Sequence, residues 1–502
     1  MNNLNFKSMN SNKIFLVLSF LICFTPGFGQ EDIHEELTFE EVMQLDREQS
    51  PDAIMAKHQF RANYWEFRTF KADFRPNLTL GTTFPEFSRA IKKYQNPDGT
   101  YTYVEDNLNS TSANLNLRQN VGFTGGQLFA TSNLARLDVF GDDESTSYLS
   151  TPVSIGYRQP VLFYNEYKWQ KKIEPLKYEE AKKQYISSLE DVSLKAVAYF
   201  FDLALAQQNL QVAQINYSNA DTLYQIATGR YNIGTIAENE LLQMELSVLN
   251  AGSGLNSALV DLEIKKFQLR SFLGFNEKVN LQLIIPKEIP TLTVDVEKAL
   301  AIARKNNPDI IAFERQLIEA ERDVAKAKSE KGLQADLFAS IGYTQQSEAF
   351  SDVYASPQDQ QRIALGLEIP ILDWGLGRGR YKMAQSSQEV IKTTVEQAKT
   401  DFVQSVYLNV MQFNLQDDQL MIAAKTDTIA QKRYDMTKQR FLIGKVDVLD
   451  LNVSLSEKDV AKINYISALR KYWSNFYNLR KITLYDFIKD QSLDTEFEEL
   501  IE

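Results

Sequence analysis

Few side chains in this chain are arranged for catalysis. Beyond the first 29 residues the sequence holds two histidines, His34 and His58, and neither has the spacing of a metal site or a catalytic triad. The run from Gly375 to Gly379, GLGRG, lacks the third glycine of a dinucleotide-binding loop and predicts a strand-to-helix turn. We therefore expect a protein that is not an enzyme and that holds no cofactor or metal.

The charge balance is acidic. The chain has 54 Lys and Arg against 66 Asp and Glu, a formal net charge of −12. Removing residues 1–30 removes Lys7, Lys13 and no acids, so −12 becomes −14. Proteins that bind nucleic acid present positive surfaces to the phosphates, so we expect no nucleic-acid partner.

The N-terminus carries an export signal. Lys7 and Lys13 precede an apolar run over residues 14–24, and the small residues Gly27 and Gly29 suit cleavage before Gln30. We predict a signal peptide at residues 1–29. The only cysteine, Cys23, lies inside it and is not preceded by the small residue of a lipoprotein signal, so we expect no lipid anchor.

The chain contains an internal repeat. Arg230–Thr235 recurs as Arg440–Lys445, an offset of 210 residues, and residues 153–163 recur at the same offset as 363–373. Near the start of each copy the offset is about 256, which indicates an insertion of some 45 residues in the first copy. We assign the insertion to residues 107–150, where Gly125-Gly126 indicates a hairpin turn. It could add two strands or form a flap.

Each copy ends in a long helical hairpin. The spacing of apolar residues predicts a helix on the order of 60 residues, ~90 Å long at 1.5 Å per residue, from about residue 165 to 229. A second long helix is expected over about 376–439, and shorter helices over roughly 236–272 and 446–482. The seam residues of the first helix recur at steps of three and four: Leu189, Val192, Ala196, Tyr199, Leu203, Ala206, Leu210, Ala213, Tyr217, Ala220, Tyr224 and Ala227.

Before each long helix, apolar and polar residues alternate, which is typical of strands with one apolar face. The apolar positions include Ala113, Leu115, Leu117, Val153, Ile155, Leu337, Ile341, Ile363 and Leu365. In a soluble sandwich such alternation separates core from solvent. An exported chain with helices too long for a globule instead favours lipid on one face and water on the other. No later segment has 18 consecutive apolar residues, so only a closed barrel would cross a bilayer.

These patterns divide the chain into five parts. Repeat 1 covers residues 30–275 and contains an opening helix, barrel strands with an inserted hairpin and a long helical hairpin. A linker over 276–291 leads to repeat 2, residues 292–483, which has the same plan without the insertion. The signal peptide, 1–29, precedes the repeats and an acidic tail, 484–502, follows them.

In this order, the motifs resemble those of the outer-membrane efflux protein family, the TolC-like channels. The motifs are the opening helices from Leu292 to Asp309, the strand ending at Ile369–Gly375 and the two helical tips. They follow one another in the order that the family has. The resemblance implies an α+β fold in which a trimeric outer-membrane β-barrel continues into a long periplasmic coiled-coil barrel. It also implies a homotrimer in outer-membrane lipid that passively exports small molecules or proteins, delivered by an inner-membrane RND or ABC pump through a periplasmic adaptor.

The resemblance assigns roles to two groups of residues. The adaptor would contact the helical tips, here Arg230, Gly234, Thr235, Arg440, Gly444 and Lys445. An acidic ring would line the periplasmic aperture at Asp450, with Glu240 as its counterpart in repeat 1. The tyrosine and arginine that lock the aperture in the family correspond to Phe441 and Val446, and a second acidic ring falls at Val453, so the lock must differ here.

A second function class stays open at this point. An exported coiled-coil scaffold with a small β domain and no pore has the same helical pattern. The exported substrate and the pump class are not encoded in these motifs.

Overall fold

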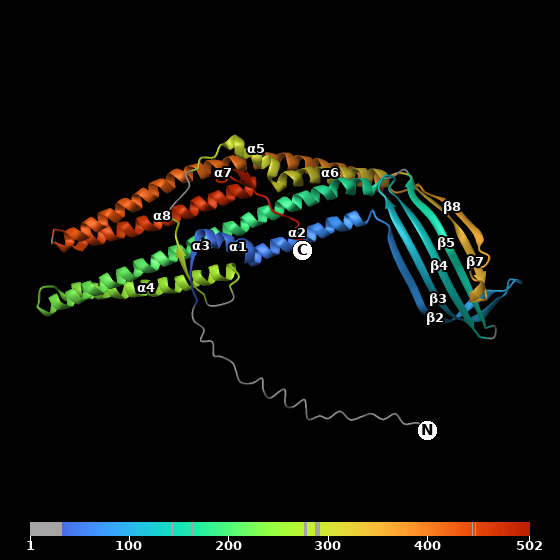
Figure 1. Ribbon diagram of the computed structural model, residues 1–502, viewed down its shortest axis with the longest axis horizontal. Helices are drawn as coiled ribbons and strands as arrows, with labels where there is room; N and C mark the ends of the chain where they lie inside the picture. The colour runs from blue at the N-terminus through green and yellow to red at the C-terminus, as the bar shows by residue number, and fades with distance from the viewer. Residues whose placement is uncertain are drawn as a thin grey trace, which may run out of the picture.

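The computed structural model describes residues 33–141, 144–161, 164–275, 279–286, 292–443, 445–446 and 448–501. The predicted signal peptide and Cys23 lie outside these ranges, as do Gly444 and part of the predicted linker. The molecule is elongated, with a β-sheet at one end and two helical hairpins at the other (Figure 1). Within the described ranges, no helix has the length and apolar character needed to cross a membrane.

Two long helices dominate the structure. Helices α3 (Glu166–Asn232) and α7 (Leu376–Leu442) each contain 67 residues, and their first and last residues are both 210 positions apart. At 1.5 Å per residue each is about 100 Å long. The return helices are α4 (Glu238–Phe272) and α8 (Val448–Thr483). The two hairpins diverge toward their tips at the end of the molecule opposite the sheet (Figure 1).

A pair of shorter helices opens each repeat, and a proline separates the members of each pair. They are α1 (Phe39–Gln49) and α2 (Pro51–Ala72), then α5 (Val296–Asn306) and α6 (Pro308–Glu330). Ser50 and Asn307 precede the two prolines, and their side-chain oxygens accept hydrogen bonds from the backbone of Ala53 and Asp309. The extended backbone of Ser50 and Asn307 separates the two helices of each pair, and proline suits the first position of the second helix because its missing N–H would have had no partner there.

One sheet contains six antiparallel strands in the order β2-β3-β4-β5-β7-β8. Strands β2 (Asn77–Gln95), β3 (Tyr101–Val121), β4 (Gly126–Phe140) and β5 (Ser145–Val161) come from the first half of the chain. Strands β7 (Gln334–Ser347) and β8 (Gln358–Glu368) come from the second half, with the short 3-10 helix η1 (Phe350–Asp352) between them. The pairing of β5 with β7 joins the two halves.

Two small sheets complete the structure. Strand β1 (Ile33–Thr38) pairs in parallel with β6 (Val279–Ile284), so the start of the chain lies against the segment between the repeats. Strands β9 (Tyr485–Asp486) and β10 (Gln491–Ser492) form an antiparallel pair after α8.

The location predicted for the inserted segment, residues 107–150, is wrong. Shifted by 210 residues, β4 and β5 fall on β7 and β8, whereas α2 and α6 begin 257 residues apart, at Pro51 and Pro308. The additional elements are therefore β2 and β3, which lie within the sheet and do not form a flap. The Gly125-Gly126 turn is real and joins β3 to β4, with Gly125 at φ +79°, but it marks the end of the insertion. The added strand β3 alternates in the same way as the shared strands, so alternation alone could not distinguish an added strand from a shared one.

The register places most of the large aliphatic residues of the six strands on one face, whereas Phe129 and Phe338 lie on the other. Leu78 pairs with Leu117, which pairs with Ala130, and the row continues through Ile155 to Ile341. The opposite face carries polar and small residues, among them Thr79, Asn116, Thr131, Ser154, Ser340 and Arg362. The large apolar side chains on the first face are exposed in the single chain: Leu78, Leu80, Leu115, Leu117, Leu128, Ile155, Ile341, Ile363, Leu365 and Leu367.

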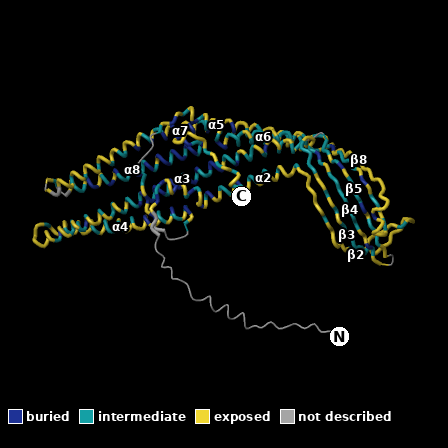
Figure 2. The backbone as a smooth tube through the Cα atoms, in the orientation of Figure 1, coloured by how far each residue is buried: buried dark blue, intermediate teal, exposed yellow. Residues whose placement is uncertain are grey.

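The buried core lies at the middle of the molecule, where α1 meets α3 and α8 (Figure 2). The ring of Phe39 lies 5.3 Å from that of Phe200 and 4.7 Å from that of Trp473, measured between centroids. Ala196 and Ala204 are buried beside these rings and let the helices approach closely. The core therefore fixes the helical layer midway between the sheet and the tips.

Candidate channel surfaces and a buried charged cluster

The two helical tips use the same turn. At the first tip the backbone N–H of Thr235 donates to the carbonyl of Arg230 over 2.9 Å, and Gly234 adopts φ +74°. At the second tip the N–H of Lys445 donates to the carbonyl of Arg440 over the same distance. A hydrogen bond from an N–H to the carbonyl five residues earlier is typical of a helix C-terminus. It pairs a carbonyl that the helix end would leave without a partner, and such a turn usually has a residue with a left-handed backbone just before the donor.

The tips expose cations and an apolar side chain together. Arg230, Thr235, Arg440 and Lys445 are exposed. Ile233 and Ile443 are also exposed at equivalent places in the two turns. Each tip thus offers a positive charge beside an uncovered isoleucine, a combination suited to docking a protein with an apolar and acidic surface. Gly444, predicted as part of the second tip, lies outside the described residues.

The predicted constriction residues lie one turn beyond the tips. Glu240 is in the first turn of α4 and Asp450 is in the first turn of α8, and both are exposed. An acidic residue in a first turn is stabilised by the positive end of the helix dipole, which is a structural role either could serve. They lie on different hairpins, so a single chain does not combine them into one site. Phe441 lies near the end of α7, and its side chain is outside the described part of the structure.

The polar face of the sheet carries an aromatic and cationic cluster. The rings of Phe129 on β4 and Phe338 on β7 stack 5.5 Å apart across Gly156 on β5. A Cβ atom at Gly156 would lie 2.3 Å from Phe129 Cζ, so only glycine fits between these rings. The guanidinium of Arg362 lies 5.5 Å from the Phe338 ring. This face therefore offers aromatic and positively charged groups as well as hydroxyl and amide groups.

The outer helices of the layer expose apolar stripes. On α7, apolar side chains recur every seven residues at Leu408, Leu415, Ile422, Ile429 and Met436, and all are exposed. On α4 the exposed stripe includes Leu242, Leu246, Leu249, Val260, Ile264 and Phe267. A groove of about 830 Å³ follows the α4 stripe and is lined by Leu249, Val260 and Tyr217. Seven-residue stripes usually pack against other helices, so these two faces remain uncovered by the described part of the single chain, although α4 packs on α3 and α7 packs on α8 through their other faces.

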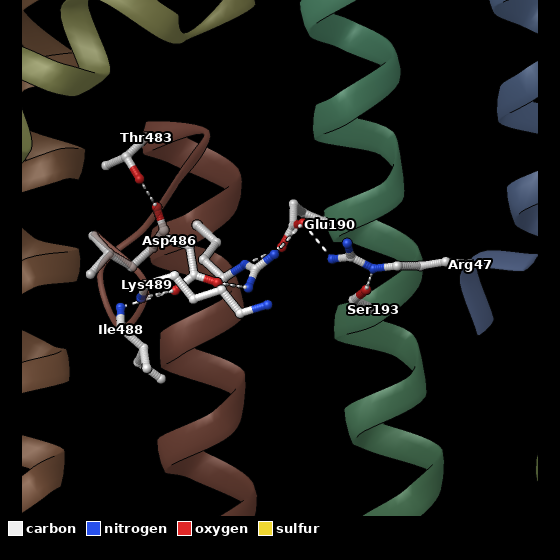
Figure 3. A network of polar contacts seen from close by, with 9 residues as sticks. Arg47, Glu190, Ser193, Thr483, Asp486, Ile488 and Lys489 are labelled. Carbon is white, nitrogen blue, oxygen red and sulfur yellow. Dashed lines mark hydrogen bonds and ion pairs between the residues drawn. The ribbon is translucent and has the colours of Figure 1, made fainter. Parts of the chain in front are cut away.

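A buried charged cluster joins three helices at the middle of the molecule (Figure 3). Glu190 on α3 is 1% exposed and accepts hydrogen bonds from Arg47 on α1 at 2.5 Å and from Arg480 on α8 at 2.9 and 3.1 Å. Arg480 also donates to Asp486 over 2.6 Å. The other oxygen of Asp486 accepts the backbone N–H groups of Ile488 and Lys489. Each charge is thus paired, as burial of charges requires.

Asp46 lies beside this cluster and is fully buried. Neither of its carboxylate oxygens accepts a hydrogen bond of normal geometry from the residues that the structure describes. Burial raises the pKa of Asp46 to about 7, while the charge of Arg47 acts in the opposite direction. Asp46 is therefore a carboxyl group that exchanges its proton near neutral pH.

We expect Asp46→Asn to remove part of the pH dependence of stability. The folded pKa is raised above the unfolded value of about 4, so the stabilisation from the protonated form is complete below that pH and is lost as pH rises through about 7. Melting temperatures of the two proteins, followed by circular dichroism from pH 5 to 8.5, should diverge in favour of the variant as pH rises. Parallel curves across this range would contradict the prediction.

The cluster consists of charged residues and therefore lies outside the apolar patterns from which the helices were predicted. Glu190 directly follows Leu189, a seam residue, and a charge at that place is a detectable signal. The repeat gives a second signal: the positions equivalent to Asp46 and Glu190 are Ala303 and Thr400, so these two buried acids occur in repeat 1 only. Comparison of charged residues between the two copies would have revealed this asymmetry.

Comparison with known proteins gives a consistent result. Residues 299–483 match the family model described as outer membrane efflux protein. The crystal structure of the Campylobacter jejuni CmeC outer membrane channel is similar, with 14% identity, a TM-score of 0.64, and coverage of 100% of this chain and 98% of that chain. The search of curated proteins found no match.

Two further channel structures have a similar fold. VceC from Vibrio cholerae is 13% identical, with a TM-score of 0.57 and coverage of 91% of this chain and 97% of that chain. The open state of the Neisseria gonorrhoeae MtrE outer membrane channel is 13% identical, with a TM-score of 0.55 and coverage of 89% and 88%. The α+β fold class predicted from the sequence is confirmed by these similarities.

Proposed function

Because the chain belongs to the outer membrane efflux protein family, we propose that three copies form one passive duct loaded by an inner-membrane pump through a periplasmic adaptor. The protein is an outer-membrane efflux channel that projects into the periplasm and is not an enzyme. The apolar face of the sheet would contact lipid, and the polar face would line the water-filled interior.

The exposed apolar stripes on α4 and α7 are the main support for the proposed trimer. In a ring of three chains, α4 of one chain would lie against α7 of the next, and both stripes would become buried. The groove along α4 is large enough to receive side chains from a neighbouring helix. The alternative, a coiled-coil scaffold without a pore, gives no role to the apolar belt across the sheet.

Fractionation and electrical recording test this function. The duct should remain with the outer membrane after high-salt washing, crosslink as a trimer in detergent and produce channel steps in a planar bilayer. A monodisperse monomer with full β content would contradict it, and a trimer that never conducts would favour the scaffold.

We propose that the tips contact the adaptor through Arg230, Gly234, Thr235, Arg440, Gly444 and Lys445. The double variant Arg230→Glu with Arg440→Glu should abolish export in cells, because it makes the first tip negative and neutralises the second, which keeps Lys445. Both side chains are exposed, and the turn uses only their carbonyls, so trimer formation should be unchanged. Export at the parental rate would place the adaptor elsewhere.

The constriction at Asp450 remains a proposal. Three copies around the axis would attract cations and repel anions. Asp450→Asn should lower cation selectivity, measured as the reversal potential in a salt gradient, and leave trimer formation intact. Glu240→Gln, at the equivalent place in repeat 1, is the control. Loss of selectivity in the control alone would assign the constriction to the first tip, and no change in either variant would exclude an acidic ring at these positions.

A further inference from the structure

Among the strands that the structure describes, β2 and β8 form the two edges of the six-stranded sheet and have no further partner strand. We infer that β2 of one chain pairs with β8 of the next, so that three chains of six strands each form a barrel of eighteen strands. This inference rests on the proposed trimer. Its new element is the β2–β3 hairpin, found only in repeat 1, as a part of the barrel wall that also forms the contact between chains.

Strand direction permits this closure. Every neighbouring pair in the sheet is antiparallel, and the number of strands is even, so β2 and β8 run in opposite directions. A neighbouring chain would therefore meet β2 with an antiparallel β8, like every other pair in the wall. An unpaired edge exposed to lipid would leave N–H and C=O groups without hydrogen-bond partners, which hydrocarbon cannot supply.

The apolar residues of the two edge strands lie on the same face of the sheet, as a continuous barrel wall requires. Leu78 and Leu80 on β2 lie on the same face as Leu365 and Leu367 on β8, according to the register of the strands between them. All four side chains are exposed in the single chain. Joining β2 to β8 would continue the apolar belt around the barrel without a polar gap.

The edge of β2 also limits the contact. Pro85 lies in a bulge between Thr83 and Glu86, and proline cannot donate to a strand ladder. The seam should therefore use residues 77–84, a length that the 11-residue β8 can cover. Beyond the bulge, residues 101–106 of β3 pair with β2 but not with β4, so the far end of this hairpin projects past the adjoining strands.

The hairpin is firmly held in the sheet. Strand β3 pairs with β4 continuously from Asn107 to Val121. The side chain of Gln119 donates to the carbonyl of Phe74 over 2.5 Å, and Asn120 donates to the carbonyl of Asp73 over 3.0 Å, which ties β3 to the end of α2. These contacts fit a permanent part of the wall.

Repeat 2 shows the simpler connection. There α6 leads to β7 through residues 331–333 only, without added strands. If repeat 1 had that connection, each chain would contribute four strands and three chains would contribute twelve. Barrel diameter grows roughly linearly with strand number, so eighteen strands give a barrel about 1.5 times as wide. The added hairpin thus favours a wider outer opening.

Cysteine crosslinking tests the seam in the full chain, since the one native cysteine, Cys23, lies in the predicted signal peptide. Thr79→Cys on β2 should be combined in turn with Arg362→Cys, Ala364→Cys or Gly366→Cys on β8, all on the polar face. At least one pair should yield covalent dimers and trimers on a denaturing gel. Thr131→Cys on β4, also on the polar face, should give none with the same partners.

The outcomes separate the two proposals. A native trimer in which β4 crosslinks to β8, or in which no β2 pair does, would overturn the eighteen-stranded barrel and leave the channel intact. A monomer without crosslinks would instead refute the proposed trimer, and the barrel with it.

A second variant tests the width. Replacing residues 73–125 with the Lys331-Gly332-Leu333 connection of repeat 2 should give a twelve-stranded channel. The diameter of the largest polymer that enters the channel from the extracellular side should fall by about a third. Entry from this side reports on the barrel and not on the helical tips. An unchanged limit in a conducting trimer would show that the hairpin does not widen the wall.

Discussion

Glu190→Ala should destabilise the protein more than any other single substitution considered, by about 3 to 5 kcal/mol. Arg47 and Arg480 both donate to the Glu190 carboxylate in the buried middle of the molecule. Without it, two guanidinium groups are left close together, with Asp486 beside Arg480 and the raised-pKa carboxyl of Asp46 beside Arg47 as the remaining acids. Thermal unfolding followed by circular dichroism in detergent, or urea unfolding, measures the loss.

The neighbouring acid provides a matched control. Asp191 pairs with Lys481 over 2.7 Å between the same two helices, but its side chain is 44% exposed. Exposed pairs contribute at most about 1 kcal/mol, so Asp191→Ala should have a small effect. Equal losses in the two variants would show that burial does not distinguish these ion pairs, and the stabilising role assigned to the cluster would be wrong.

Leu249→Asp on α4 should convert the trimer to monomers. Leu249 is 65% exposed in the single chain and lies on the apolar stripe and in the groove that a neighbouring helix is proposed to fill. Three copies of an unpaired carboxylate would then be buried in the trimer, a cost of several kcal/mol for each contact. Light scattering in detergent and chemical crosslinking would report the change in mass.

Gln243→Asp supplies the control for that variant. It introduces the same charge on α4 six residues away, at an exposed position beside Leu242 but off the stripe. Its trimer should survive. If Leu249→Asp also stays trimeric, the stripe faces something other than a neighbouring chain.

The sequence predicted the helices well because one rule governs their whole length. The three-and-four spacing from Leu189 to Ala227 lies within α3, and the predicted start near residue 165 is close to Glu166. The shared tip motif also predicted both turns, because a helix end with a left-handed residue has a narrow set of sequences.

Strand number and charge pairing were harder to predict, for physical reasons. The strands other than β2 follow the same alternation, so the pattern detects a strand without stating which strand it will pair with. The segment that the alternation missed, Asn77–Gln95, contains Pro85 and a bulge that shift its period midway. Partners such as Glu190 and Arg480, 290 residues apart, become neighbours only after the helices have packed.

The positions of the ion pairs along α8 have a mechanical consequence. Near the middle of the molecule, Arg470 and Lys481 fasten α8 to α3 through Asp202 and Asp191. Nearer the tip, Glu457 and Lys462 fasten it to α7 through Arg433 and Asp427. A rigid tilt of the α7–α8 hairpin about a fulcrum at Arg470 would act over about 33 Å, the distance to the first residue of α8 at 1.5 Å per residue. A tilt of about 10° at the fulcrum would displace the tip by about 6 Å. The same rotation moves atoms beside the core much less, so the displacement is largest at the tip.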